Sequence, residues 1–188
     1  VQHNMPFDTA FNNALKGKVV INQHEEEKEI NVALISHGYN IYDKRVCMDV
    51  FKKLDSLGVK VHSAYNLTDD QLKDGMSALN VDLYWANQLE MSGAAGYYLR
   101  SLDIDGIITI TAFGCGPDSL MIEDINRKAK NFNKPLLNLT IDEHTGEAGF
   151  VTRLEAFCDM LDRKKHAYKA ENKEEIIVPV DDYTINLR

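Results

Sequence analysis

Four apolar segments along the chain have the length and composition of buried β-strands. They are residues 30–36 (INVALIS), 59–62 (VKVH), 105–113 (DGIITITAF) and 134–141 (KPLLNLTI). The longer ones are almost continuously apolar, which is typical of parallel strands that are covered on both faces. A further apolar stretch at 176–180 contains Pro179, and a proline restricts such a stretch to an edge strand or an extended arm.

Between the strand segments, apolar residues recur at helical spacing. We expect helices at residues 43–58, 84–102, 117–132 and 146–165. In the first helix the apolar stripe is Val46, Val50, Leu54 and Leu57, with Asp43 as N-cap and Gly58 as the stop. In the second, Gly93 and Gly96 permit close packing or a bend. Residues 66–80 are expected to form a loop with one or two short helical turns.

The alternation of strands and helices predicts an α/β fold. We expect a Rossmann-like, doubly wound sheet of about four parallel strands in the order 2-1-3-4, with helices on both faces. This domain spans residues 30–165, after a peripheral segment at 1–29. A tail at 166–188 follows, and its apolar stretch can add a strand at the edge of the sheet. Because the chain starts at Val1, we expect it to be part of a longer polypeptide.

Composition narrows the functional classes. The chain has 188 residues and a formal net charge of −8, which argues against a protein that binds the nucleic-acid backbone. No apolar run approaches the roughly 18 residues of a membrane span, so we expect no membrane partner. The three cysteines show no CxxC pairing and make no disulfide framework, which favours the reducing cytoplasm.

Three loops are expected at the carboxyl edge of the sheet, where ligands bind in folds of this class. They are residues 36–43, 113–119 and 142–149. The middle loop places Cys115 between Gly114 and Gly116, just before a Pro-Asp-Ser helix start. Glycines allow another group to approach closely, and a helix N-terminus favours a thiolate or another anion. The thiol is therefore a candidate metal ligand, a candidate nucleophile, or a residue of a tight turn.

The other two loops supply candidate polar groups. The loop after the first strand carries His37, Tyr39, Tyr42 and Asp43. These side chains can orient a ligand or move protons. Alternatively, Asp43 caps the helix and the tyrosines seal the edge of the sheet. The third loop carries Asp142, Glu143, His144 and Glu147, which can bind a cation or a ligand, or cap a helix. There is no GxGxxG fingerprint and no zinc-type His/Cys spacing.

The remaining cysteines and Ser119 have simpler interpretations. Cys47 lies beside the apolar stripe of its helix, and Cys158 shares a face with Leu154, Phe157 and Leu161. Buried cysteine behaves as a small hydrophobic residue, so both are predicted to be core residues. No serine-elbow motif surrounds Ser119, which is predicted to lie in the first turn of its helix.

These blocks resemble a known family. "DEHTGEAGFVTRLEAFCDML" resembles the closing segment of the 2-hydroxyacyl-CoA dehydratase D-component superfamily. "DGIITITAFGCGPDS" and "HGYNIYD" resemble its branch of CoA-substrate-specific enzyme activases and activase-related proteins. The resemblance spans roughly residues 31–163, and residues 1–29 and 166–188 take no part in it.

The resemblance implies an iron–sulfur protein of which this chain is the C-terminal domain. Cys115 would be one ligand of a [4Fe–4S]-type cluster, beside the candidate cofactor-binding residues Gly114, Gly116 and Ser119. A cluster needs about three or four protein ligands. The others would come from preceding domains, so this chain alone should hold no stable cluster unless a dimer supplies ligands from both copies. Implied partners are those preceding domains, an acyl-CoA substrate, and an ATP-dependent activator or redox partner.

Two other functions stay open. A thiol enzyme would use Cys115 as nucleophile and His37 as base, which requires the two groups to meet across loops. His37, Tyr39, Asp142 and Glu143 are the candidate catalytic groups. Alternatively, the domain keeps the fold without chemistry and serves as a module that binds a small anion, a CoA fragment or another protein.

Overall fold

The computed structural model describes residues 15–16, 30–79 and 86–174. Its strands are β1 (Ile30–Ser36), β2 (Val59–Ser63), β3 (Gly106–Ala112) and β4 (Leu136–Ile141). They form one parallel sheet in the order β2-β1-β3-β4. The predicted fold class and strand order are confirmed, and the four strand segments are close to those predicted from the apolar runs.

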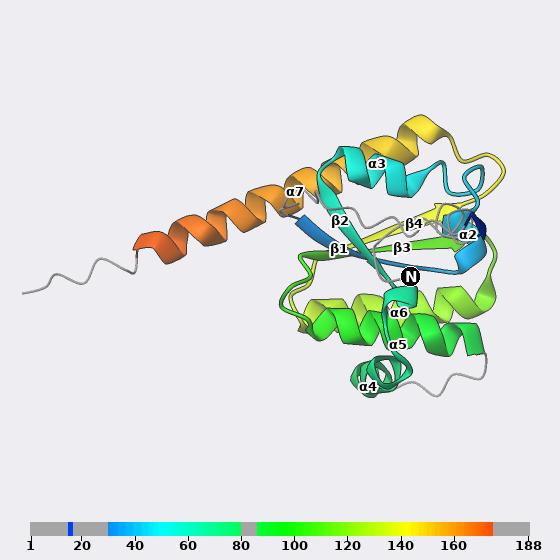
Figure 1. Ribbon diagram of the computed structural model, residues 1–188, viewed down its shortest axis with the longest axis horizontal. Helices are drawn as coiled ribbons and strands as arrows, with labels where there is room; N and C mark the ends of the chain where they lie inside the picture. The colour runs from blue at the N-terminus through cyan, green and yellow to red at the C-terminus, as the bar shows by residue number, and fades with distance from the viewer. Residues whose placement is uncertain (1–14, 17–29, 80–85, 175–188) are drawn as a thin grey trace, which may run out of the picture.

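Helices cover both faces of this sheet (Figure 1). On one face lie α3 (Val50–Ser56) and α7 (Glu147–Glu174). On the other lie α5 (Ala86–Arg100) and α6 (Gly116–Asn131), with α4 (Asp69–Leu79) packed outside α5. The short elements α2 (Gly38–Tyr42) and η1 (Ala64–Asn66) follow β1 and β2. No helix in the described part of the chain is long and apolar enough to span a bilayer.

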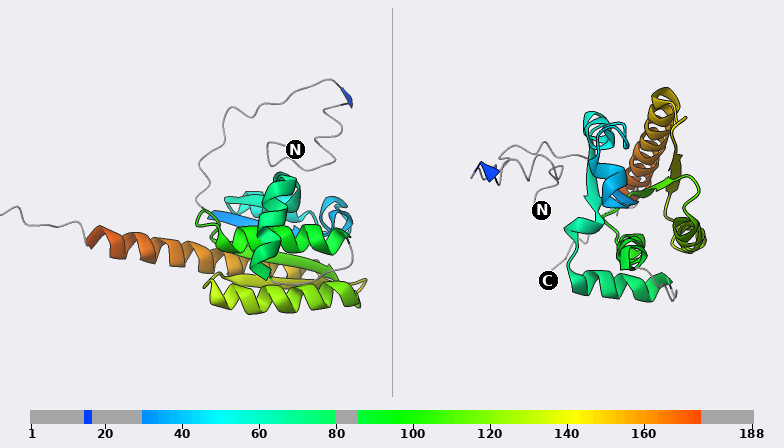
Figure 2. Two further views of the ribbon diagram at one scale, coloured as in Figure 1. Left: turned by 90° about the horizontal axis from the view of Figure 1, so that it is seen from below. Right: turned by 90° about the vertical axis from the view of Figure 1, so that its right-hand side faces the viewer.

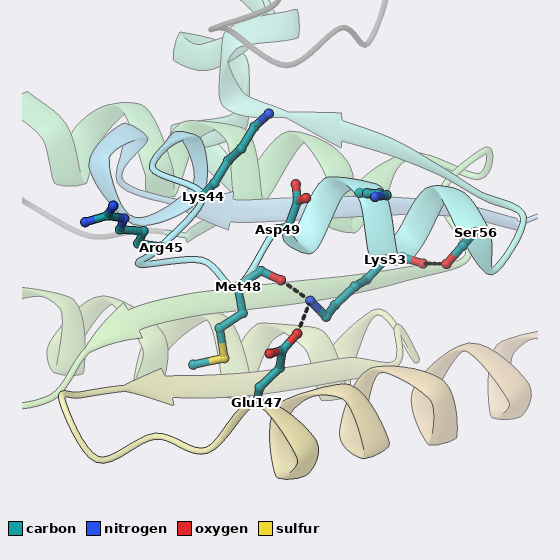
Figure 3. A pocket seen from close by; sticks show the side chains of 8 residues that line it. Lys44, Arg45, Met48, Asp49, Lys53, Ser56 and Glu147 are labelled. Carbon is teal, nitrogen blue, oxygen red and sulfur yellow. Dashed lines mark hydrogen bonds and ion pairs between the residues drawn. The ribbon is translucent and has the colours of Figure 1, made fainter.

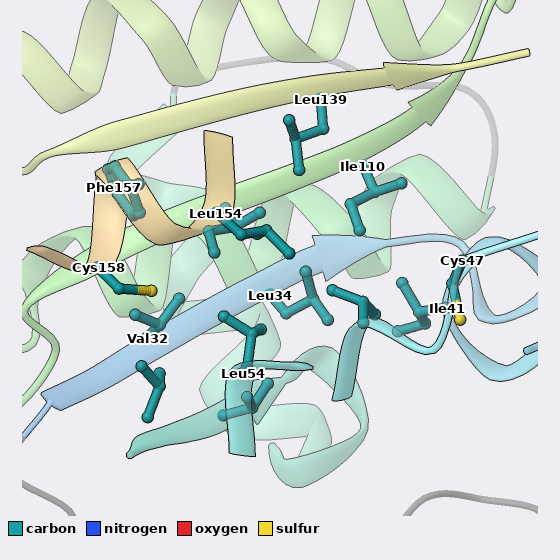
Figure 4. Close-up of a cluster of buried hydrophobic side chains, with 14 of the residues drawn as sticks. Val32, Leu34, Ile41, Cys47, Leu54, Ile110, Leu139, Leu154, Phe157 and Cys158 are labelled. Atoms are coloured by element: carbon teal, nitrogen blue, oxygen red, sulfur yellow. The ribbon is translucent and has the colours of Figure 1, made fainter. Parts of the chain in front are cut away.

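Strands β1 and β3 alternate their side chains between two cores. Val32 and Leu34 point to the α3 and α7 side, where Leu54, Leu154 and Phe157 pack against them (Figure 4). Ala33 and Ile35 point to the opposite side, which is filled by residues of α5 and α6. The near-continuous apolar character of β1 and β3 follows from this burial on both faces.

The predicted helix at 43–58 is wrong over its first half. Asp43 does cap a turn, because its carboxylate accepts the N–H groups of Arg45 and Val46, but the turn is not continued. Met48 and Asp49 adopt positive φ angles of 50° and 57°, which break the helical path. Helix α3 therefore begins only at Val50, and Val46 is 41% exposed instead of buried in the stripe. The stop at Gly58 is correct, with a φ of +71°.

Residues 66–80 were expected to be mostly loop, and they instead hold the 11-residue helix α4. Helix α4 packs on α5 through glycines. A methyl group on Gly75 would lie 1.8 Å from the Gly93 carbonyl oxygen, and one on Gly96 would lie 2.1 Å from the Gly75 carbonyl oxygen. The close packing predicted for Gly93 and Gly96 is correct, and its partner is this helix.

The described residues cover the predicted domain at 30–165 except for 80–85, and little of the segments on either side of it. Helix α7 runs past residue 165 to Glu174, and its final turns project beyond the sheet (Figure 2). The N-terminal segment 1–29, apart from residues 15–16, and the expected edge strand at 176–180 lie outside the described residues.

Candidate functional site

The loops after β1 and β3 leave the sheet side by side. These strands are paired, with Ser36 opposite Ile110, and β2 lies on the far side of β1. The chain therefore leaves β1 for β2 on one side and later returns to β3 on the other. In doubly wound sheets this reversal opens a crevice at the carboxyl ends of the strands.

A buried contact between a histidine and a carboxylate joins these two loops. His37, the residue after β1, places Nε2 2.9 Å from Oδ1 of Asp118, in the first turn of α6. His37 is 7% exposed and Asp118 is fully buried. The sequence pointed to His37, but Asp118 had been interpreted only as part of a helix start.

Cys115 joins the same cluster. One ring nitrogen of His37, Sγ of Cys115 and a carboxylate oxygen of Asp118 all lie within 4.8 Å of one another. Cys115 is the N-cap residue of α6 and is partly exposed. Within the described residues this is the one group of three or more His, Cys, Asp or Glu side chains close enough to share an ion. We call it the His37–Cys115–Asp118 cluster.

The Asp118 carboxylate is bonded unevenly. Its Oδ1 accepts from Gln88 Nε2 at 3.1 Å as well as facing His37. Its Oδ2 is buried and has no hydrogen-bond partner. Gln88 comes from α5 and is itself 5% exposed. Sequence reasoning missed Gln88, because an amide in a helix of small residues carries no signal of its own.

The electrostatic surroundings of Cys115 oppose its ionisation. Desolvation raises the pKa of the thiol, the nearby backbone N–H of Asp118 lowers it, and the Asp118 carboxylate raises it again. The net direction is upward, which is opposite to the thiolate that the helix N-terminus was expected to favour. His37 and Cys115 meet, as a thiol enzyme requires, and the raised pKa of the thiol leaves less thiolate at neutral pH.

The two glycines that flank Cys115 differ in backbone conformation. Gly114 has a φ of +78°, a conformation that favours glycine, and Gly116 opens α6 without such a requirement. The exposed hydroxyl of Ser119 donates to the Cys115 carbonyl at 2.8 Å, as expected of a residue in the first turn.

Tyr39 covers His37. The two rings stack with centroids 5.0 Å apart and planes 12° apart, while Tyr39 itself is 59% exposed. Desolvation, Asp118 and Cys115 all raise the pKa of its phenol. Beside these rings a small pocket of about 220 Å³ extends towards Tyr65, Glu90 and Met91. A ligand in this pocket would contact His37 directly.

The acidic loop after β4 does not join the cluster. Asp142 is exposed and closes its own turn, accepting from the Thr145 hydroxyl at 2.7 Å and from the His144 N–H at 3.0 Å. These contacts lower the pKa of Asp142. Glu143 is 82% exposed, 3.6 Å from His144. Neither carboxylate belongs to the group of potential metal ligands, although both were candidates.

Cys47 and Cys158 are buried in the core on the α3 and α7 side, as predicted (Figure 4). Burial raises the pKa of Cys158 to about 11. Cys115 is therefore the one cysteine of the chain that reaches the surface.

A second, open cavity of about 630 Å³ lies beside α3 and the start of α7 (Figure 3). Four cationic side chains and two carboxylates contribute to its lining, namely Lys44, Arg45, Lys52, Lys53, Asp49 and Glu147. The central cation is already engaged, since Lys53 bonds the Met48 carbonyl and pairs with Glu147 at 2.8 Å.

A comparison of the chain with known protein families and with curated proteins finds no match.

Proposed function

We propose that this chain is the C-terminal α/β domain of an iron–sulfur protein, dehydratase-like or activase-related, in which Cys115 supplies one ligand of a [4Fe–4S]-type cluster. The observation that carries the proposal is the position of Cys115. It is partly exposed and lies at the carboxyl edge of the sheet, where the strand order reverses, whereas the other two cysteines are core residues.

The surroundings of Cys115 leave room for a group larger than an ion. A methyl group added to Gly114 or Gly116 would meet no atom within 4 Å, so the loop is open on both sides of the sulfur. One cysteine is too few for a cluster, which needs about three or four protein ligands. The remaining ligands would come from preceding domains of the same polypeptide.

A bound cluster of this kind would supply one-electron chemistry at low potential. The domain's own residues would tune it. Asp118 places negative charge beside the sulfur, which disfavours an additional electron, and the potential of a cluster depends on such charges and on hydrogen bonds to its sulfurs. Nε2 of His37 lies 2.9 Å from this carboxylate and would orient it. The family resemblance adds an acyl-CoA substrate and an ATP-dependent activator or redox partner.

The test is the iron and sulfide content of the longer polypeptide that includes the preceding domains, reconstituted without oxygen. We expect wild-type protein to hold iron and sulfide in equal amounts and Cys115→Ala to lose most of both. Cys158→Ala, which also removes one thiol but leaves the loop intact, should retain them. If wild type binds no iron and Cys115→Ala changes nothing, the cluster is refuted and the non-catalytic binding module is the better hypothesis.

A further inference from the structure

We infer that the His37–Cys115–Asp118 cluster is a site for a single divalent transition-metal ion of the zinc or ferrous class, which this chain binds without ligands from any other domain. The inference goes beyond the proposed iron–sulfur cluster, because it assigns His37 and Asp118 as ligands and needs no further cysteine.

The donor set selects the class of ion. Thiolate and imidazole together favour zinc, iron and their neighbours, whereas magnesium and calcium prefer oxygen donors alone. Bond lengths of about 2.0–2.3 Å place tetrahedral ligand atoms ~3.3–3.8 Å apart. The ligand atoms here lie within 4.8 Å of one another. An ion fits after side-chain shifts that replace the hydrogen bond between His37 Nε2 and Asp118 Oδ1 with bonds to the metal.

The buried carboxylate provides the second, independent observation. Asp118 is fully buried, yet its Oδ2 has no hydrogen-bond partner among the described residues. An ionised carboxylate with an unsatisfied oxygen is costly to bury, and a cation bound to that oxygen would offset the cost. The carboxyl group that carries this oxygen lies in one cluster with a thiol and an imidazole, which are two further donor types of transition-metal sites.

The surrounding contacts would hold the ligands in place. Gln88 donates to Oδ1 of Asp118 and leaves Oδ2 for the ion. Tyr39 stacks on the His37 ring and fixes its plane. Such outer contacts orient metal ligands and contribute to affinity. On binding, Cys115 becomes a thiolate ligand and its proton passes to the buffer. Three protein ligands leave a fourth position for water or substrate.

The compactness of the donor set separates this site from an iron–sulfur cluster. In a cubane each protein ligand binds a different iron, so the ligand atoms stand farther apart than ligands that share one ion. His37, Cys115 and Asp118 are too close together to bind three irons of one cubane in the arrangement seen. The two uses of Cys115 therefore exclude each other, and a polypeptide that supplies more cysteines would shift the competition towards the cluster.

The experiment uses Co²⁺ as the probe, added to the metal-free 188-residue chain in the absence of iron and sulfide. We expect one equivalent to bind, with a near-ultraviolet sulfur-to-cobalt charge-transfer band and visible bands of tetrahedral intensity. Cys115→Ser should abolish the charge-transfer band. His37→Gln and Asp118→Asn should each weaken Co²⁺ binding by about tenfold or more. His144→Gln, which changes an exposed histidine near the same edge of the sheet, should leave binding unchanged.

Absence of the charge-transfer band with excess Co²⁺, or its persistence in Cys115→Ser, would overturn the inference. So would equal weakening by His37→Gln and His144→Gln. Circular dichroism shows whether Asp118→Asn folds. If it does not, Cys115→Ser and His37→Gln still test the metal site, and Cys115→Ser is the safer of the two because Cys115 lies on a partly exposed loop. Since no iron or sulfide is present, the result is separate from that of the reconstitution test.

Discussion

The loops that follow β3 and β4 leave neighbouring strands at the same edge of the sheet, yet only one of them takes part in the candidate site. Each is associated with a pair of a histidine and a carboxylate. In the first pair, Asp118 after β3 contacts His37 from the loop after β1; both residues are buried, and the two atoms lie 2.9 Å apart. The pair at the β4 loop, His144 with Glu143, is more than four-fifths exposed at 3.6 Å. Polar groups become a site where the fold removes them from water and leaves part of their bonding capacity unused.

The largest difference between the two pairs should be in stability. Asp118→Ala leaves His37 and Gln88 without their shared buried acceptor, and we expect it to lower the free energy of unfolding by ~3 kcal/mol. Glu143→Ala removes an exposed, solvent-screened contact and should change it by less than about 0.5 kcal/mol. Urea unfolding followed by circular dichroism, with a chelator present, measures both.

If Asp118→Ala and Glu143→Ala unfolded at the same urea concentration, the buried pair would contribute no more to stability than the exposed pair. Asp118→Asn sharpens it, because an amide oxygen still accepts from Gln88 while the charge is lost. We expect this variant to lie between Asp118→Ala and wild type.

The second difference concerns thiol reactivity. Cys115 is partly exposed, so iodoacetamide should modify it in the native chain while Cys47 and Cys158 react only on unfolding. The Asp118 carboxylate helps to raise the pKa of the Cys115 thiol. Asp118→Asn should therefore speed alkylation at neutral pH by about two- to tenfold, because more thiolate is present.

The matched control for this rate is Asp142→Asn in the β4 loop, which should leave it unchanged. Peptide mass spectrometry over a time course follows the three thiols separately. A rate for Cys115 that is equal in wild type and Asp118→Asn would show that the carboxylate does not act on the sulfur.

The sequence was sufficient to predict which loops meet. Near-continuous apolar runs such as residues 30–36 identify strands that are buried on both faces, and strands alternating with helices specify the parallel order. From that order it follows that His37 and Cys115 reach the same edge of the sheet. Both residues are candidates on the sequence alone.

The sequence was not sufficient to predict side-chain direction. Asp118 turns into the crevice because Gly114, with its positive φ, and the extended Cys115 set the entry of α6. That local path cannot be derived from residue types, so Asp118 was interpreted only as part of the helix start. Asp142 lies outside the cluster, and Thr145 and His144 bind its carboxylate within its own turn. Helix α4 was missed because its packing depends on the backbone of α5.

The smallest expected effect is the pH dependence of the β4 loop. The Thr145 hydroxyl is the main cause that lowers the pKa of Asp142 in the folded chain. The folded state then binds fewer protons than the unfolded state below about pH 4. The contribution of Asp142 to stability is present above that range and is lost as the pH falls through the folded pKa. Because Asp142 is exposed, water screens the contact and the loss should be small.

Thr145→Val tests this directly, because it removes the hydroxyl and keeps the shape of the side chain. Urea midpoints measured between about pH 3 and pH 7 should separate from wild type near neutrality and converge at the acid end. His37 and Asp118 are the same in both proteins, so the difference between the curves reports the β4 loop alone. A difference that grew towards low pH would mean that protonated Asp142 is the better partner of Thr145. In that case the loop would not be closed by its carboxylate, and the contrast with the buried pair at the β3 loop would have to be explained by burial alone.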